Sequence, residues 1–390
     1  MASIFLSAGE ASGEHYGAAL IAALRNRLPD ARFSGLGGAG MRAAGCDCIV
    51  RAEDVAVMGI TEVIHHMPRI YGRYRRLTAH LRRNPPDIAI LIDFPDVNLR
   101  LAKTLRRLNV PVVYFVSPQL WAWKKRRIRW VQQRVTKMLV IFPFEAPFYR
   151  EHGVAAEFVG HPLADLPAPQ ASREEFAQKW HLDADKLWIG LLPGSRVREL
   201  RLNLAVMAQA AALLGDGYEY LLPVAPTLDE AWVRAEVART TTKARIRVVQ
   251  DARAVLLHAQ ASIVASGTAT VQAALIGNPF LAVYRLSTLS YAVASRLVKL
   301  PHVAMPNLIA GRRIVPELIQ DEFTAVHTAN ALRLLLQDGP ARQTMMQDLQ
   351  TLREALHPEE SLPGATAIDR AADAVVSLLA ERPPTQMGPR

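Results

Sequence analysis

Four short segments of the chain combine small, polar and charged residues where an apolar run gives way to a helical pattern: residues 9–14, 93–98, 192–199 and 265–270. In open parallel sheets, ligands bind beyond the carboxyl ends of the strands. The free N–H groups at the start of a helix also favour anions. These four segments are therefore the first candidates for chemistry.

Asp93 closes an apolar run, residues 87–93, that is typical of a strand covered on both faces. A carboxylate desolvated at the end of such a strand has a raised pKa and can take a proton from a hydroxyl group. Asp93 is therefore a candidate catalytic base, and the alternative is that it only ends the strand. For Asp96 we favour a structural role, as the cap of a helix that begins near Val97.

The first segment, residues 9–14, lacks the glycine spacing of a dinucleotide-binding loop. Glu10 and Glu14 disfavour a bound phosphate there and favour a polar, hydroxyl-rich ligand. A tight strand-to-helix turn with Ser12 as its N-cap is the alternative. The candidate binding residues for such a ligand are Glu10, Ser12 and Asn98.

The other two segments lie in the second half of the chain. Residues 192–199 add Arg196 to the backbone donors of a helix start, a combination that suits a diphosphate. Residues 265–270 repeat the turn, and two such turns are more specific than one, with ordinary strand–helix turns as the alternative. The candidate diphosphate-binding residues here are Gly194, Ser195, Arg196, Ser266, Gly267 and Thr268.

A basic amphipathic pattern covers residues 63–86, which contain six arginines and no acid. Apolar and aromatic residues recur three or four positions apart between the arginines. This pattern favours a helix bound to an anionic membrane surface, and a solvated helix face is the alternative. The predicted membrane contacts are Ile64, Met67, Ile70, Tyr71, Arg73, Arg75 and Arg76. A second basic and aromatic cluster follows at residues 121–130.

We predict neither a metal site nor a disulfide framework. The two cysteines are Cys46 and Cys48, and no histidine or cysteine at finger-like spacing joins them. Asp183 and Asp185 have the spacing of a metal-binding pair but lie in a polar stretch typical of a solvated turn. Such cysteine usage suits a reducing cytosol, and we expect no signal peptide.

Alternating strand and helix patterns predict how these segments are positioned. Such alternation is typical of parallel, doubly wound sheets. Residues 161–172 carry three prolines and indicate a linker, after which the alternation restarts. We therefore predict an α/β protein with two Rossmann-like domains facing across a cleft, residues 1–165 and residues 176–355. We expect a helix within residues 356–381 to pack back on the first domain, and residues 382–390 to be disordered.

The predicted strands and helices follow from the period of the apolar residues. The strands are residues 3–8, 32–37, 87–93, 110–116, 137–142 and 155–159, then 187–192, 218–224, 245–249, 261–265 and 279–284. Residues 14–28, 199–214 and 268–276 are predicted helices, and residues 324–380 are predicted to be helical throughout. Residues 254–284 form a run without Asp, Glu, Lys or Arg, which we interpret as buried globular structure because polar residues, Gly and Pro interrupt it.

The composition is that of a folded protein with one basic part. Of 390 residues, 50% are hydrophobic and 21% are charged, with 46 Lys and Arg against 36 Asp and Glu. The first 160 residues carry 23 basic and 13 acidic residues, and the rest carry 23 of each. A local excess of positive charge indicates a local anionic partner, such as membrane headgroups, a phosphorylated ligand or nucleic acid.

Together these motifs resemble the lipid-A-disaccharide synthases, bacterial glycosyltransferases of the lipopolysaccharide pathway. The similarity covers about residues 3–380, and the order and number of its motifs make it specific. The stretches that carry it are Ser7-Ala-Gly-Glu-Ala-Ser-Gly13, Ala56-Val-Met-Gly-Ile60, Asp93-Phe-Pro-Asp-Val-Asn98, Val116-Ser-Pro-Gln-Leu-Trp-Ala-Trp123, Leu191-Leu-Pro-Gly-Ser-Arg196, Ala265-Ser-Gly-Thr-Ala269 and Pro306-Asn-Leu-Ile-Ala-Gly311.

The resemblance implies a GT-B fold and an inverting transfer that uses no metal and no cofactor. Family members join UDP-2,3-diacylglucosamine to 2,3-diacylglucosamine 1-phosphate and release UDP, leaving a β-1,6-linked disaccharide. They work in the cytoplasm, peripherally on the inner membrane. Asp93 matches the family's proposed general base. The resemblance implies that residues 1–165 bind the acceptor and face the membrane, with Glu10, Ser12 and Asn98 as acceptor-binding residues. It implies that residues 176–355 bind the UDP-sugar donor through the diphosphate-binding residues named above, and Asn307 and Glu317 fall in the same donor-side region. Glu14 stands where the family commonly has aspartate. A homodimer is left open.

Three other functions use some of the same features. One is another GT-B enzyme acting on UDP-GlcNAc-type donors, such as a lipid-linked sugar transferase or an epimerase, although an epimerase does not need the basic amphipathic segment. A second is a non-catalytic peripheral membrane protein. The third is nucleic-acid binding, which we do not expect because no RRM, KH or helix-turn-helix pattern accompanies the basic charge.

Overall fold

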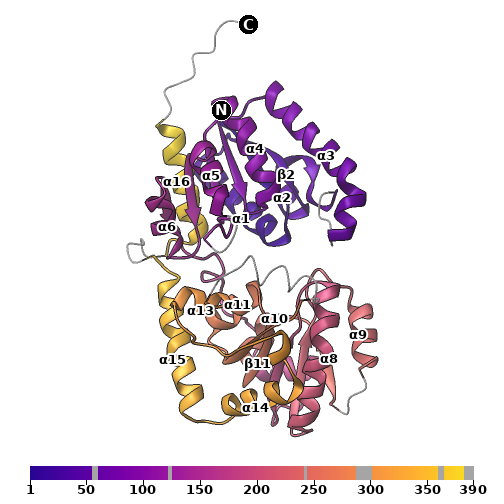
Figure 1. Ribbon diagram of the computed structural model, residues 1–390. Coiled ribbons are helices and arrows are strands. Elements are labelled where there is room, and N and C mark those ends of the chain that lie inside the picture. Colours follow the sequence, from indigo (N-terminus) through magenta and orange to yellow (C-terminus); the bar gives the residue numbers. More distant parts are fainter. Residues whose placement is uncertain (55–59, 122–124, 241–243, 287–300, 359–363, 382–390) are drawn as a thin grey trace, which may run out of the picture. The chain divides into compact units, whose positions relative to one another are not determined.

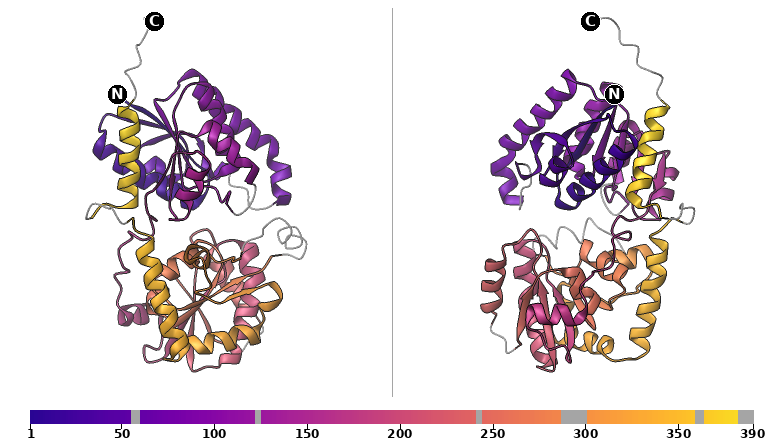
Figure 2. Two further views of the ribbon diagram at one scale, coloured as in Figure 1. Left: turned by 60° about the vertical axis from the view of Figure 1, so that its left-hand side comes forward. Right: turned by 180° about the vertical axis from the view of Figure 1, so that it is seen from behind.

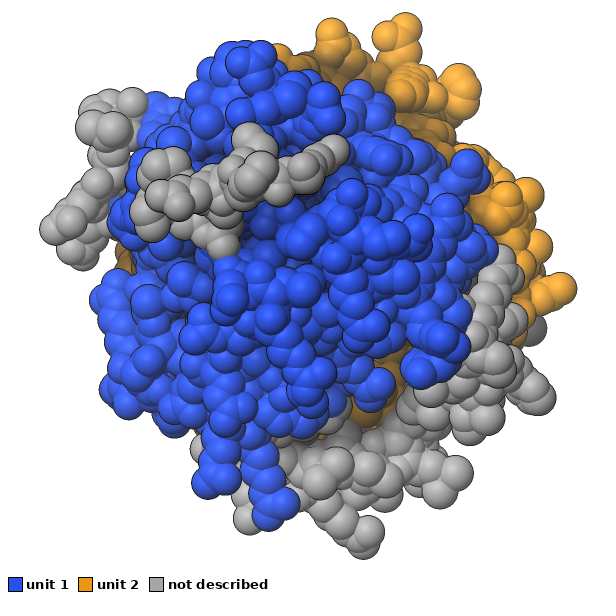
Figure 3. Space-filling model, turned by 90° about the horizontal axis from the view of Figure 1, so that it is seen from above, with its two compact units in different colours: residues 1–165, 356–390 blue, residues 166–355 orange. Residues whose placement is uncertain are grey.

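The chain forms two compact α/β units (Figures 1 and 3). The computed structural model describes residues 1–54, 60–121, 125–240, 244–286, 301–358 and 364–381, and for residues 60–70 it describes the helix without its side chains. Unit 1 consists of Met1–Asp165 and Leu356–Arg390, and unit 2 of Leu166–Ala355.

Unit 1 is built on a seven-stranded parallel sheet with the order β3-β2-β1-β4-β5-β6-β7. Its strands are β1 (Ser3–Ala8), β2 (Arg32–Gly37), β3 (Cys46–Arg51), β4 (Ile88–Ile92), β5 (Val112–Phe115), β6 (Lys137–Val140) and β7 (Ala156–Phe158). Its helices are α1 (Ala11–Arg27), α2 (Ala39–Ala43), α3 (Ile60–Arg83), α4 (Pro95–Arg107), α5 (Ile128–Arg134), α6 (Glu145–Glu151) and α16 (Ala367–Ala380).

The centre of this sheet is its most apolar part. All five residues of β4 are buried, as expected of a strand with helices on both faces. The direction in which strands are added to the sheet reverses between β1 and β4. Such a reversal is the switch point of a doubly wound fold, where ligands bind beyond the carboxyl ends of the strands.

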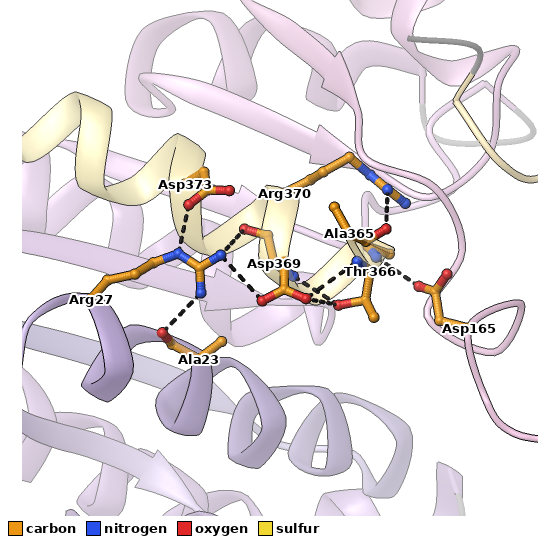
Figure 4. A network of polar contacts seen from close by, with 9 residues as sticks. Ala23, Arg27, Asp165, Ala365, Thr366, Asp369, Arg370 and Asp373 are labelled. Carbon is orange, nitrogen blue, oxygen red and sulfur yellow. Dashed lines mark hydrogen bonds and ion pairs between the residues drawn. The ribbon is translucent and has the colours of Figure 1, made fainter. Parts of the chain in front are cut away.

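The C-terminal helix α16 packs against α1 and completes unit 1 (Figures 1 and 2). Arg27 on α1 donates hydrogen bonds to the carboxylates of Asp373, at 2.5 Å, and Asp369, at 3.1 Å (Figure 4). Thr366 and Asp369 form a capping box at the start of α16, and the Asp165 carboxylate accepts from the Ala367 N–H. Polar contacts therefore join the two ends of the chain within one unit.

Unit 2 is built on a six-stranded parallel sheet with the order β10-β9-β8-β11-β12-β13 and its own switch point between β8 and β11. Its strands are β8 (Leu187–Leu192), β9 (Tyr218–Pro223), β10 (Ile246–Val249), β11 (Ala261–Ala265), β12 (Phe280–Tyr284) and β13 (Glu317–Ile319). Its helices are α7 (Arg173–Trp180), α8 (Val197–Leu214), α9 (Glu230–Ala238), α10 (Ala252–His258), α11 (Thr268–Ile276), α13 (Met305–Ala310), α14 (Ala325–Leu336) and α15 (Pro340–Ala355).

The fold confirms the predicted doubly wound α/β class and differs from the sequence-based elements in three places. β3 and β13 were not predicted, because Asp47 interrupts the apolar pattern of the first and the second has only three residues. The prediction that residues 324–380 are helical throughout is wrong, since α14, α15 and α16 are separate helices. In the part of the chain that the structure describes, no helix is long and apolar enough to cross a membrane.

Candidate active-site residues

Asp93 lies at the switch point of unit 1, beside the turn that follows β1. It is the first residue after β4, and Gly9 follows β1 directly. The Phe94 ring lies so close to Gly9 that a Cβ there would come within 2.4 Å of it. The two turns are therefore packed against each other, as a small residue at position 9 allows.

The backbone at Asp93 is held in an unusual conformation. Asp93 and Phe94 both have positive φ, 46° and 49°, which side-chain-bearing residues rarely adopt. The Asp93 carbonyl accepts hydrogen bonds from the Tyr114 hydroxyl, at 2.6 Å, and from the Asn98 amide, at 2.7 Å. Its N–H donates to the Phe115 carbonyl at 3.0 Å. Strain held in place by several contacts is common at functional sites.

The environment of Asp93 gives its carboxylate the protonation behaviour of a base. Burial, and then the negative charge of Glu10, raise its pKa to about 6, while a hydrogen bond from the Phe94 backbone opposes the shift. Among the described residues, no cation forms an ion pair with it. A carboxylate with this pKa is mostly ionised at neutral pH and is more basic than an ordinary aspartate.

The predicted acceptor-binding residues have different surroundings. Glu10 and Ser12 are exposed beside the start of α1. Ser12 is not the N-cap, because α1 begins at Ala11 and Glu10 occupies the cap position. Asn98 is fully buried, and its amide donates to the carbonyls of Ser7, Ile92 and Asp93. Asn98 thus positions the Asp93 backbone, and its part in acceptor binding stays a prediction.

Two neighbouring acids have structural partners. Asp96 is not the cap of α4, which begins at Pro95, and its carboxylate pairs with Arg127 at 2.6 Å. Glu14 accepts a hydrogen bond at 2.8 Å from the N–H of Met41, in the first turn of α2. This contact gives position 14 a role in joining α1 to α2.

In unit 2, the turns after β8 and β11 flank the second switch point. Gly194 and Gly267 have φ of +124° and +149°, which a residue with a side chain rarely adopts. A Cβ at Gly267 would meet no atom within 4 Å, and α11 starts there without a side-chain cap. The first N–H groups of α11 are thus accessible, and neighbouring Thr268 is exposed.

The loop before α8 is ordered by one carboxylate. Glu199 accepts a hydrogen bond from the Ser195 N–H at 3.0 Å and another from Arg196 at 3.4 Å. The Arg196 side chain is 68% exposed, so its guanidinium can also contact a ligand. Across the switch point, the Ser266 hydroxyl donates to the Val303 carbonyl at 3.3 Å.

Asn307 and Glu317, predicted to bind the donor, are buried and bonded to the chain itself. Glu317 accepts from the N–H groups of Val303 and Ala304 and from the Asn307 amide. Asn307 is fully buried, and its carbonyl oxygen accepts from the N–H groups of Ile314 and Val315. The pair thus holds the loop at residue 303 beside Ser266, and its part in donor binding stays a prediction.

The predicted membrane segment forms the helix α3. Tyr71, Arg75 and Arg76 are exposed, while Leu77 and Leu81 are buried on the opposite side. Arg73 pairs with Asp54 at 3.3 Å, so part of its charge is already compensated. The side chains of Ile64, Met67 and Ile70 lie outside the described residues. Of the cluster at residues 121–130, residues 122–124 also lie outside them.

The described residues contain no group of three or more His, Cys, Asp or Glu side chains arranged to hold a metal ion. The Asp183 carboxylate accepts a hydrogen bond from the Asp185 N–H at 3.0 Å, a local turn contact. Asp183 therefore stabilises the turn before β8.

Two doubly wound units of this kind form the GT-B fold. CalG4, the calicheamicin glycosyltransferase, aligns with 98% of this chain and 100% of its own, with a TM-score of 0.60 and 17% identity. The UDP-GlcNAc 2-epimerase from Neisseria meningitidis aligns with 97% of this chain and 99% of its own, with a TM-score of 0.55 and 11% identity. At these identities the likeness shows the fold alone, and transferases and epimerases share it.

Sequence comparison determines the family. The model of the lipid-A-disaccharide synthetase family matches residues 4–369. The lipid-A-disaccharide synthase of Acidobacterium capsulatum is 59% identical over 97% of each chain. That of Koribacter versatilis is 52% identical over 97% of this chain and 99% of its own. The chain therefore belongs to the lipid-A-disaccharide synthase family and is a glycosyltransferase.

Proposed function

We propose that this protein joins UDP-2,3-diacylglucosamine to 2,3-diacylglucosamine 1-phosphate, without a metal ion and with inversion at the anomeric carbon. The products are the β-1,6-linked disaccharide 1-phosphate and UDP. Family membership supports the class of reaction. The observation that carries the mechanism is the Asp93 carboxylate, held at a switch point with a pKa of about 6.

In the proposed reaction, Asp93 takes the proton of the acceptor's 6-hydroxyl as that oxygen attacks the anomeric carbon of the donor. The new carbon–oxygen bond forms on the face opposite the diphosphate, and the bond from carbon to the diphosphate oxygen breaks. UDP leaves with that electron pair, and Asp93 keeps the proton until it passes to water. A base of raised pKa suits this step because it holds the proton better than an ordinary aspartate does.

Unit 2 supplies the groups that we propose for the departing diphosphate. The exposed Arg196 guanidinium and the uncapped N–H groups at the start of α11 can stabilise the negative charge that develops on the leaving group. In this scheme they do the work that a metal ion does in other phosphate chemistry. Asn307 and Glu317 act indirectly, because they fix the loop at residue 303 that bonds Ser266.

We also propose that α3 rests on the anionic, cytoplasmic surface of the inner membrane, from which the acylated substrates come. The exposed side chains of Arg75 and Arg76 support this location, and so does the exposed Tyr71, one turn before Arg75 on the same helix. Basic residues also outnumber acidic residues within the first 160 residues, which favours attraction to an anionic surface.

The deciding experiment incubates the purified protein with both substrates in the presence of EDTA and measures UDP and disaccharide. We expect both products in equal amounts, with a β linkage by NMR. Asp93→Asn should keep the fold and lower the rate by about 10²–10⁴-fold, the usual contribution of a general base. A requirement for added Mg²⁺ would contradict metal independence, and an Asp93→Asn rate within a few-fold of wild type would remove Asp93 from the mechanism. Conversion of a UDP-sugar without an acceptor would favour an epimerase.

A further inference from the structure

Glu145 is the most deeply buried acidic side chain among the described residues, and the reaction above does not use it. It is the first residue of α6 and only 1% exposed. Burial raises its pKa to about 7, although hydrogen bonds to the carboxylate oppose the shift. A buried ionisable group is costly, so its retention calls for a physical reason.

Two of the partners of Glu145 come from a segment more than twenty residues upstream, and a third is the nearby backbone. Its Oε1 accepts from the Ser117 hydroxyl at 2.5 Å and from the Trp121 indole N–H at 3.1 Å. Its Oε2 accepts from the Phe142 N–H at 3.2 Å. None of these partners is a cation, so neutral donors alone compensate the charge. The ionised carboxylate accepts from all three donors, whereas protonation places a hydrogen on one oxygen and weakens the bonds that this oxygen accepts.

The segment that Glu145 holds starts beside Asp93. Ile92 and Phe115 are paired neighbours in β4 and β5, which places Asp93 next to Val116. Val116 has a φ of 61°, exceptional for a β-branched residue. The strand β5 that fixes the Asp93 backbone through Tyr114 therefore continues directly into residues 117–121.

Two further contacts show that this segment is firmly anchored. The Tyr149 hydroxyl, also from α6, donates to the Pro118 carbonyl at 3.1 Å. The Trp121 ring packs edge-on against Phe144, with centroids 4.9 Å apart. With its N–H bonded to Glu145, the half-buried indole has no other polar group to satisfy, and its exposed part is an apolar surface.

We propose that Glu145 is a positioning residue, which holds Ser117 and Trp121 so that residues 117–121 form one wall of the acceptor site beside Asp93. This inference rests on the proposed function, because it assigns unit 1 to the acceptor. Glu145 touches neither substrate and acts through the indole and the hydroxyl that it binds.

The first test is Glu145→Gln, which keeps the shape of the side chain but removes its charge. One carboxylate oxygen is replaced by an amide N–H₂ group, which cannot accept the hydrogen bonds that this oxygen accepted. The acceptor KM should rise by about tenfold, the effect of weakening a charge-assisted hydrogen bond. The donor KM should change by less than about twofold. Glu151→Gln is the matched control, because Glu151 ends the same helix and is exposed. It should behave like wild type.

The second readout is the pH profile of kcat/KM for the acceptor. In wild type, activity should fall in two proton steps on the acid side, as Glu145 protonates near pH 7 and Asp93 near pH 6. In Glu145→Gln the step near pH 7 should disappear and leave a single-proton limb. A residue that merely supports the fold would lower the profile without changing its shape.

The other titratable groups around Glu145 do not produce such a step. Tyr149 has a pKa raised by burial, and His161, which packs against Phe142, has a pKa lowered to about 3, so both stay neutral from pH 5 to 8. Lys137 and Glu157, on the strands under α6, pair with each other at 2.6 Å. The loss of the step near pH 7 on the change to Gln is thus the signature of Glu145, because the phosphate of the acceptor titrates in wild type and variant alike.

Trp121→Phe is the second variant, because it removes the indole N–H and keeps an aromatic ring. Its effect on the acceptor KM should not add to that of Glu145→Gln in the double variant, since both remove the same contact. If Glu145→Gln does not fold, Trp121→Phe still tests the proposal through the acceptor KM.

Four results are decisive. Equal rises in both KM values, an unchanged acceptor KM, or a retained step near pH 7 in a folded Glu145→Gln variant would each overturn the positioning role. If wild type makes no disaccharide from the two substrates, the proposed function itself fails and this inference fails with it. If wild type does make the disaccharide but any of the first three results is found, the positioning role of Glu145 is rejected and the proposed function stands.

Discussion

Asp93 and Glu145 are both carboxylates whose pKa burial raises, yet their surroundings suit different tasks. The side chain of Glu145 accepts hydrogen bonds from Ser117, Trp121 and Phe142, so its oxygens are occupied. The Asp93 side chain has a single backbone donor, from Phe94, and a negative neighbour in Glu10. A carboxylate with free lone pairs can accept a proton from a substrate, whereas one with occupied lone pairs serves to hold its donors.

The effect of Glu10 on Asp93 gives a prediction with a definite sign. The negative charge of Glu10 raises the pKa of Asp93, so Glu10→Gln should lower that pKa. The Asp93 limb of the kcat/KM profile, which starts near pH 6, should then move to lower pH. The shift should be less than about one pH unit, because burial, the larger cause, persists. The plateau also changes if Glu10 touches the acceptor, so the midpoint of the limb is the readout.

Asp30→Asn is the control for this prediction. Asp30 is an exposed acid before the start of β2, at the edge of the sheet opposite the site. Its removal should leave the midpoint in place. A midpoint that moves upward in Glu10→Gln, or moves equally in both variants, would contradict the assigned coupling.

The sequence indicates which polar residues gather near the sites but not which of their atoms are free. Asp93 was predictable, because it ends an apolar strand. Asn98, Asn307 and Glu317 stand in the same motifs, yet the chain's own backbone uses their hydrogen-bonding groups. Glu145 was missed because its partners, Ser117 and Trp121, lie far from it in sequence and nothing local marks the contact.

At the scale of elements, the starts of two helices carry the donor half of the proposal. The turns into α8 and α11 follow adjacent strands, β8 and β11, so their N–H groups leave the same edge of the sheet. This arrangement was predictable from strand–glycine–helix patterns alone. The positive φ of Asp93 and Phe94 was not, because neither residue is glycine and the contacts that hold them come from β5 and α4.

Arg196 is the side chain of this region that we expect to affect turnover most. Arg196→Ala should lower kcat/KM for the donor, because a charge-assisted contact to the leaving group is lost. The loss should correspond to about 2–4 kcal/mol of transition-state stabilisation. Arg353→Ala is the control, because Arg353 is an exposed arginine on α15 to which we assign no role in either site. Kinetics with varied donor measure the effect. A loss of less than a few-fold would assign the diphosphate charge to other groups.

The helix α3 should bind membranes through charge and apolar contacts together. Arg75→Glu and Arg76→Glu should weaken binding to anionic liposomes, most at low salt, since each arginine contributes at most about 1 kcal/mol near such a surface. Tyr71→Asp should weaken binding also where salt screens the charges, because Tyr71 is 59% exposed. Liposome sedimentation at two salt concentrations measures both effects.

Two comparisons make the membrane result specific. Arg353→Glu reverses the same charge on an exposed face of unit 2 and should bind like wild type. Turnover of a short-chain, soluble substrate analogue should change little in all of these variants, because α3 holds none of the residues that we propose for the chemistry. Wild-type binding by the α3 variants would identify this surface as an ordinary solvated face.

At the scale of the whole molecule, the chain builds unit 1, then all of unit 2, and then returns to unit 1. The sequence predicted the two doubly wound parts, because strand and helix periods alternate, stop near the prolines of residues 161–172 and start again. The sequence also led us to expect a helix within residues 356–381 that returns to the first domain. It did not predict that residues 324–380 divide into the separate helices α14, α15 and α16, of which α16 packs against α1.

The return of the chain predicts that unit 1 depends on the last helix. Ala367, Ala371, Ala372 and Val375 of α16 are buried, and Asp369 and Asp373 bind Arg27 of α1 (Figure 4). A protein that ends after Ala355 loses this cover and exposes the apolar side of α1. In scanning calorimetry, the transition of unit 1 should therefore move to lower temperature, while that of unit 2 stays in place.

A protein that ends after Glu381 keeps α16 and serves as the matched truncation, with both transitions expected at the full-length temperatures. UDP identifies the transition of unit 2, because a ligand that binds the folded unit raises its melting temperature. Equal shifts of both transitions in the shorter protein, or no shift in either, would show that α16 is not a specific part of unit 1.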